Sequence, residues 1–159
     1  MSDFQTEPFM RPAQGHQAAD QRFPAPPKLH WSLLVLFTVM TFGIFFLVWM
    51  FIQSSWAHKV DPGSQATAFF AGEVFLYLLS LVFAASSSSA LKSLELPLLL
   101  GSCIPFYAGV YSIRRTMLDH YNKVEAIPLE ISGAMTFFFG LLHLQYHMTR
   151  MAYAKTDGK

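Results

Sequence analysis

Four long apolar stretches occupy most of this chain, at about residues 29–53, 67–86, 94–113 and 129–147. The first contains no Asp, Glu, Lys or Arg. A helix of that length would measure about 36 Å, and the hydrocarbon core of a bilayer is about 30 Å thick. The pattern therefore predicts an all-α integral membrane protein with four transmembrane helices over these ranges.

Polar segments flank and interrupt these stretches. Residues 1–27 are rich in Pro and Gln and predict a disordered tail, followed by a four-helix transmembrane domain over 28–150 and a polar tail over 151–159. Between the third and fourth stretches, apolar residues recur every three or four positions from Ile113 to Val124 among charged ones. This spacing predicts an interfacial amphipathic helix over about 114–126 that continues the third span.

Aromatic and turn residues mark the expected ends of the first span. Trp31, Trp49 and Trp56 predict anchors at the headgroup boundary, where indole rings are favoured. Asp61 could cap the second helix with Pro62 at its first position, or Pro62-Gly63 could form a turn. Both alternatives predict a tight antiparallel hairpin.

Small residues predict where helices pack closely. Gly101 and Gly109 share a face of the third span with Pro105, where we expect a kink. In the fourth span, the spacing of Ser132, Thr136 and Gly140 predicts a second helix-packing face.

Composition agrees with a lipid environment. Hydrophobic residues make up 53% and charged residues 13% of the chain, whereas soluble proteins carry about 25% charged residues. The net charge of +1 argues against a nucleic-acid partner. The single cysteine, Cys103, excludes an intrachain disulfide and a cysteine-based metal site.

The distribution of Lys and Arg predicts the orientation. With four spans, seven of these residues lie on the side of both termini and four on the other. Since cytoplasmic loops carry the excess of positive charge, both termini are expected in the cytoplasm.

Glu73 is the sharpest polar exception, because it lies inside the second apolar stretch. An ionised carboxylate there costs about 2.5–3.5 kcal/mol on insertion scales, so the group must be protonated, paired or turned toward the bundle. It could carry a proton or coordinate an ion, or it could make an interhelical hydrogen bond.

His143 and His147 share one face of the fourth span at i, i+4 spacing. They are weak candidates for a metal or haem site, since two ligands do not complete a zinc site and no sequence signal places Glu73, His58 or His30 beside them. The alternative is a pair of interfacial anchors. We therefore predict no metal and no cofactor.

Arg114, Arg115 and Lys123 form a basic patch on the amphipathic helix. Contact with anionic lipid headgroups would contribute about 1 kcal/mol per charge. A solvated face is the alternative.

Two stretches carry a resemblance to a known family. They are Lys28–Trp31 with Thr41–Trp49 and Ala57–Pro62, and Asp119–Asn122 with Leu129–Ser132, Phe137–Gly140 and Gln145–His147. Over residues 28–150 the chain resembles small four-span proteins of bacterial inner membranes that are classed as a domain of unknown function. Because that family's pattern has an aromatic residue at the position of His143, the resemblance implies that the histidine pair is not a family trait.

No catalytic signature stands in the sequence, so we do not expect an enzyme. The leading hypothesis is an accessory, scaffold or assembly protein of a bacterial inner membrane that packs against itself or a larger membrane complex. A small transporter or oligomeric channel that uses Glu73 and the kinked third span is the alternative. A redox site at the histidine pair is the third hypothesis.

Overall fold

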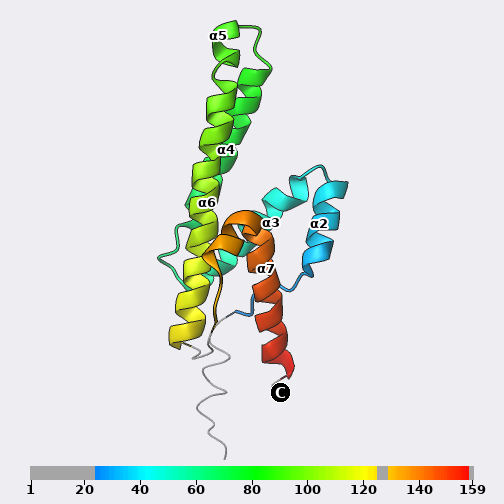
Figure 1. Cartoon of the computed structure of the whole chain (residues 1–159), viewed down its shortest axis with the longest axis vertical. Coiled ribbons are helices and arrows are strands. Elements are labelled where there is room, and N and C mark those ends of the chain that lie inside the picture. Colours follow the sequence, from blue (N-terminus) through cyan, green and yellow to red (C-terminus); the bar gives the residue numbers. More distant parts are fainter. Residues whose placement is uncertain (1–23, 125–128, 158–159) are drawn as a thin grey trace, which may run out of the picture.

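The computed structural model describes residues 24–124 and 129–157, and Figure 1 shows their arrangement. All regular structure within these residues is helical, which confirms the predicted all-α class. In chain order the helices are α2 (Trp31–Met40), α3 (Ile44–Val60), α4 (Ala66–Ala84), α5 (Ser89–Lys92), α6 (Glu95–Asp119), the π-helix η1 (His120–Val124) and α7 (Gly133–Asp157).

A long hairpin of α4 and α6 dominates the molecule, and α5 lies in its closing loop (Figure 1). Among the described residues, Ala66–Ala84 and Ser89–Val124 are the stretches long and apolar enough to cross a membrane, with mean hydropathies of 1.9 and 1.5. The second stretch includes α5, α6 and η1. The second and third predicted spans therefore correspond to candidate membrane helices, whereas four spans are not confirmed.

The first predicted span is divided, so the expectation of one continuous helix over 29–53 is wrong. Helix α2 ends at Met40 and α3 begins at Ile44, with Phe42 and Gly43 at positive φ, 50° and 92°. The N–H of Gly43 donates to the carbonyl of Thr38 (2.8 Å) and that of Phe42 to Val39 (3.2 Å), as in a Schellman motif. Apolar content does not reveal such a break, because every side chain around it is compatible with lipid.

The connection between α3 and α4 is a short turn, as predicted. The backbone N–H of Ser64 donates to the carbonyl of Asp61 (2.9 Å), and the N–H of Gly63 donates to the Asp61 carboxylate (2.9 Å). The turn alternative is therefore confirmed, and Asp61 does not cap α4, whose N-cap is Gln65. The Asp61 carboxylate instead accepts its hydrogen bond from Gly63 within the turn.

Helix α6 runs without interruption through Pro105 and past the predicted end of the third span. It reaches Asp119 and passes directly into η1. The predicted amphipathic helix is therefore a continuation of α6 as far as Val124, and its last two residues lie outside the described part of the chain.

The fourth predicted span differs most from expectation. Residues 129–132 are not helical, α7 begins at Gly133, and Gly140 interrupts it with φ 50° and ψ −127°. The helix then continues to Asp157, through most of the region predicted as a polar tail. Pro128, the expected start signal, lies outside the described residues.

Helices α3 and α7 contact the hairpin near its Ala66 end, and α2 contacts α3 and α7; we call this part of the molecule the base (Figure 1). Its core contains aromatic, aliphatic and Met side chains from α3, α4, α6 and α7, including Met50, Phe70, Val110, Ile113, Met117, Leu144 and Met148. Beyond the base extends the distal hairpin, formed by residues 75–84, α5 and residues 95–104. Its large apolar side chains are exposed, including Phe75, Leu78, Val82, Leu96, Leu100 and Ile104.

Candidate functional sites

A buried glutamine, Gln145 of α7, is the centre of the polar network in the base. Its Oε1 accepts a hydrogen bond from Trp49 Nε1 (3.0 Å) and another from Gln53 Nε2 (2.8 Å), both on α3. All three side chains are buried. Trp49 is therefore a core residue of the base, and the expectation of a headgroup anchor there is wrong.

The same glutamine binds the segment that leads into α2. Gln145 Nε2 donates to the carbonyls of Leu29 (2.8 Å) and Pro27 (3.1 Å). Buried Trp56 donates from Nε1 to the carbonyl of Pro24 (3.0 Å), so its indole N–H is also satisfied within the protein. The last residues of the predicted disordered tail are thus ordered against α3 and α7, while residues 1–23 lie outside the described part.

Sequence reasoning missed this network, although a signal for it was present. Gln53 and Gln145 are amide side chains in apolar stretches, and a buried amide without a partner costs free energy. Such residues are expected to bond to one another or to backbone carbonyls across helices.

Glu73 lies in α4, inside a candidate membrane helix. It is half-buried, and its Oε2 atom is buried with no hydrogen-bond partner within the described residues. The preceding residue, Gly72, faces Pro105 of α6. Within the described residues, no hydrogen bond to Oε2 therefore offsets the cost of burying this carboxylate oxygen.

His143 and His147 are brought together, as their spacing predicts. Their ring centroids are 4.7 Å apart, and the rings meet edge to face at 86°. Nε2 of His143 and Nδ1 of His147 are buried and have no hydrogen-bond partner within the described residues. No third His, Cys, Asp or Glu from the described part of the chain joins them as a metal-ligand group, and this applies equally to Glu73, His58 and His30.

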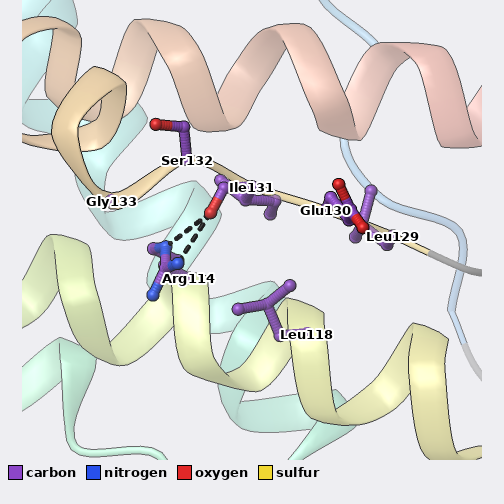
Figure 2. A pocket seen from close by; sticks show the side chains of 7 residues that line it. All are labelled: Arg114, Leu118, Leu129, Glu130, Ile131, Ser132 and Gly133. Carbon is purple, nitrogen blue, oxygen red and sulfur yellow. Dashed lines mark hydrogen bonds between the residues drawn. The ribbon is translucent and has the colours of Figure 1, made fainter.

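Arg114 clamps the segment that precedes α7. Its Nε and Nη2 atoms donate to the carbonyl of Ile131 at 3.1 and 2.6 Å, and Figure 2 shows the guanidinium pointing from α6 to that oxygen. Asn122 makes two further bonds, to the N–H (2.7 Å) and the carbonyl (3.1 Å) of Leu129. Side chains of α6 and η1 therefore replace the backbone bonds that a helix would have provided here.

A depression of about 560 Å³ lies beside this clamp. Arg114 and Leu118 of α6 line one side, and the segment before α7 lines the other (Figure 2). The lining residues are Arg114, Leu118, Leu129, Glu130, Ile131, Ser132 and Gly133.

The other two residues of the predicted basic patch face outward. Arg115 Nε lies 3.7 Å and Lys123 Nζ 2.6 Å from the carboxylate oxygens of Asp119. The hydrogen bond from Lys123, with the charge of Arg115, lowers the pKa of Asp119. The three basic residues thus do not form one surface, because Arg114 is turned toward Ile131.

The two glycines predicted to pack helices have different roles. A Cβ atom at Gly109 would lie 2.5 Å from Cε1 of Phe70, so the close approach of α4 and α6 depends on this glycine. At Gly101, a Cβ atom would meet nothing within 4 Å. Close packing is therefore present within the chain at Gly109, and Gly101 faces open space.

The residues Ser132, Thr136 and Gly140 do not lie along one helical face. Ser132 precedes α7, and its carbonyl accepts bonds from the N–H (3.0 Å) and the hydroxyl (2.8 Å) of Thr136. Thr136 is fully buried, and Gly140 is the point where the helix is interrupted. These residues shape the first turns of α7.

Comparison of the chain with known protein families, curated proteins and solved structures gives no match. The resemblance to the four-span bacterial family therefore stays a prediction.

Proposed function

We propose that this protein is a non-enzymatic accessory, scaffold or assembly protein of a bacterial inner membrane. It would pack through the distal hairpin against itself or against a larger membrane complex. The observation that carries the proposal is the projection of this hairpin beyond the base with exposed apolar side chains on both of its helices. Two candidate membrane helices build that hairpin.

The open face at Gly101 supports a packing role. Small residues let helix backbones approach each other in lipid, where dispersion contacts replace the hydrophobic effect as the driving force. Gly109 is already covered by Phe70, whereas Gly101 has no neighbour within 4 Å. Ile104, one turn along the same side of α6, is 75% exposed.

A cysteine at position 104 provides a direct test, because Ile104 lies on the same side of α6 as Gly101, whereas Cys103 does not. In isolated membranes of the variant Cys103→Ser, Ile104→Cys, oxidation with copper phenanthroline should yield a disulfide-linked dimer, or an adduct with a cysteine-bearing partner. Gly101→Leu should reduce the yield at least tenfold by separating the helices. The matched control is Gly63→Leu, which alters a glycine in the α3–α4 turn. Protein that stays monomeric, forms no adduct and co-purifies with nothing after mild detergent extraction would refute the proposal.

A second candidate function, transport of protons or cations, is favoured by Glu73. Its Oε2 atom has no hydrogen-bond partner within the described residues and lies in a candidate membrane helix. A carboxylate in lipid is a functional hypothesis by default. In liposomes, Glu73→Gln should abolish a pH-dependent flux while expression is unchanged, and Glu95→Gln in the first turn of α6 is the matched control. Equal fluxes of wild type and Glu73→Gln would exclude this function.

A further inference from the structure

We propose that α2 and α3 form a re-entrant hairpin, which enters and leaves the bilayer on the same side. The turn at Thr41–Gly43 would lie among the lipid acyl chains, while α4 and α6 cross the bilayer completely. This inference rests on the membrane placement proposed above. It assigns the start of α2, the end of α3 and the Asp119 end of α6 to one membrane face and α5 to the other.

The directions of α2 and α3 place the two outer ends of this helix pair on one side. In Figure 1 the turn between α2 and α3 points toward the α5 end of the molecule and lies partway along the α4–α6 hairpin. The start of α2 and the end of α3 both point the opposite way, away from α5. The two ends of this helix pair are therefore on one side.

The length of α2 agrees with that arrangement, whereas α3, with 17 residues and about 26 Å, is longer and carries polar residues such as His58 and Lys59 in its second half. Helix α4 has 19 residues and measures about 28 Å, close to the roughly 30 Å hydrocarbon core. Helix α2 has 10 residues and measures about 15 Å, half of that thickness. A helix of this length does not cross a bilayer but reaches its middle.

The backbone N–H groups of the turn need no water, because each of them has an acceptor within the protein. Irregular backbone inside a membrane is tolerated where its polar groups are satisfied. Four successive N–H groups donate to backbone carbonyls: Thr41 to Phe37 (3.0 Å), Phe42 to Val39 (3.2 Å), Gly43 to Thr38 (2.8 Å) and Ile44 to Thr41 (3.1 Å). The next N–H, of Phe45, donates to the hydroxyl of Thr41 (2.9 Å).

The side chains at this turn are apolar and face outward. Phe42 is 98% exposed, and its neighbours Val39, Met40 and Ile44 are about two-thirds exposed. By contrast, the turn between α3 and α4 displays Asp61, Pro62 and Gly63. One turn thus matches an acyl-chain environment, and the other matches water or headgroups.

The distribution of positive charge gives an independent argument. With the re-entrant hairpin, seven Lys and Arg positions of the described residues lie on the membrane face opposite α5, and Lys92 lies on the α5 face. The seven are Lys28, Lys59, Arg114, Arg115, Lys123, Arg150 and Lys155. Four complete spans would instead divide the same eight residues equally, with Lys28, Lys92, Arg150 and Lys155 on one side. Since positive charge concentrates in the cytoplasm, the re-entrant arrangement is favoured, and the membrane face opposite α5 is the cytoplasmic one.

Cysteine accessibility tests this topology. In a Cys103→Ser background, His30→Cys and Lys59→Cys place thiols at exposed positions near the two ends of the α2–α3 pair. Phe42→Cys places one at the turn, and Ser88→Cys places one beside α5. Each variant is treated with a membrane-impermeant maleimide in intact cells and in inverted vesicles, and again after detergent solubilisation. Cys103→Ser without a new cysteine is the control.

We expect His30→Cys and Lys59→Cys to react in inverted vesicles and at least tenfold less in intact cells. Ser88→Cys should show the reverse, and Phe42→Cys should react only after solubilisation. Met40→Cys, two residues earlier at the end of α2, should behave as Phe42→Cys does and covers the case in which the latter does not fold.

Three results would overturn the inference in different ways. Reaction of His30→Cys and Lys59→Cys from opposite sides would mean that α2 and α3 cross the bilayer together, and the membrane proposal would stand. Reaction of Phe42→Cys and Met40→Cys before solubilisation would place the turn in water. Reaction of all variants from both sides, with the protein in the soluble fraction, would refute the membrane placement itself.

Discussion

The base and the distal hairpin are stabilised in different ways. In the base, the core residues around Phe70 and Met117 are fully buried, and Gln145 joins α3, α7 and the segment before α2 through hydrogen bonds. In the distal hairpin, α4 and α6 contact each other, while Phe75, Leu96 and Ile104 are exposed. The base therefore supplies its own apolar environment, whereas the distal hairpin needs one from its surroundings.

This contrast separates two kinds of hydrophobic residue that look alike in the sequence. Burial against other helices stabilises a fold in water or in lipid, but an exposed apolar face is stable only in lipid or against a partner. Substitutions in the two regions should consequently change different measured quantities.

The largest effect is expected from a charge in the distal hairpin. Ile104, at the middle of α6, is 75% exposed, and Lys at the centre of a membrane helix costs about 3 kcal/mol of insertion free energy. Ile104→Lys should therefore lower the membrane-integrated fraction measured by alkaline extraction. Tyr153→Lys, at an exposed position of α7, should leave it unchanged. Equal integration of both variants would show that the distal hairpin is not in contact with lipid.

In the base, loss of the central amide should reduce folding stability. Gln145→Leu leaves the side chains of Trp49 and Gln53 and the carbonyl of Pro27 without the hydrogen bonds that Gln145 makes to them. Unsatisfied buried polar groups cost about 1–3 kcal/mol each, and partial rearrangement should leave a net loss of about 2–3 kcal/mol. Unfolding of detergent-solubilised protein measures it. Gln65→Leu, at the exposed N-cap of α4, should change stability by less than about 0.5 kcal/mol.

Two glycines of α6 should respond in opposite directions to the same substitution. Gly109→Ala places a methyl group against Phe70 and should destabilise the protein by about 2 kcal/mol, as overpacking does. Gly101→Ala meets no neighbour and should stabilise the monomer by about 0.5–1 kcal/mol through helix propensity. Thermal unfolding of the two monomeric variants measures the difference. Destabilisation of equal size would contradict the packing of α4 against α6.

A smaller effect is expected at the clamp before α7. Arg114→Gln removes the two charge-assisted hydrogen bonds to the Ile131 carbonyl and should cost about 1.5 kcal/mol. The neighbouring Arg115→Gln, at an exposed side chain, should cost less than about 0.5 kcal/mol. Chemical unfolding of both variants is the measurement. If the two losses were equal, the inward role of Arg114 would be wrong.

The smallest effect concerns pH. Because Lys123 and Arg115 lower the pKa of Asp119 in the folded protein, its ionised form stabilises the fold. That contribution is complete above the pKa of about 3.9 that Asp has in the unfolded chain, and it is lost as pH falls through the lower folded value. For these exposed ion pairs it should amount to less than about 0.5 kcal/mol. Unfolding curves measured down to pH 3 should show this loss in wild type but not in Asp119→Asn.

Much of the helical content was predictable from the sequence, because apolar runs without charge are sufficient to predict helices in lipid. The stretches 67–86 and 94–113 correspond to α4 and α6, and Pro62-Gly63 forms the expected turn. The meeting of His143 with His147 follows from helical spacing and needs no tertiary contact. These features depend on interactions between residues that are near in sequence.

The tertiary structure decided where apolar runs are divided and which polar groups meet. The break at Phe42 is formed by backbone hydrogen bonds, and its sequence signal is the single residue Gly43, which an uninterrupted helix also tolerates. The network of Gln145 joins residues more than ninety positions apart, and a local pattern carries no information about such pairs. For the same reason Gly101 and Gly109 are alike in sequence, yet only the packing of α4 on α6 places Phe70 against one of them and leaves the other open.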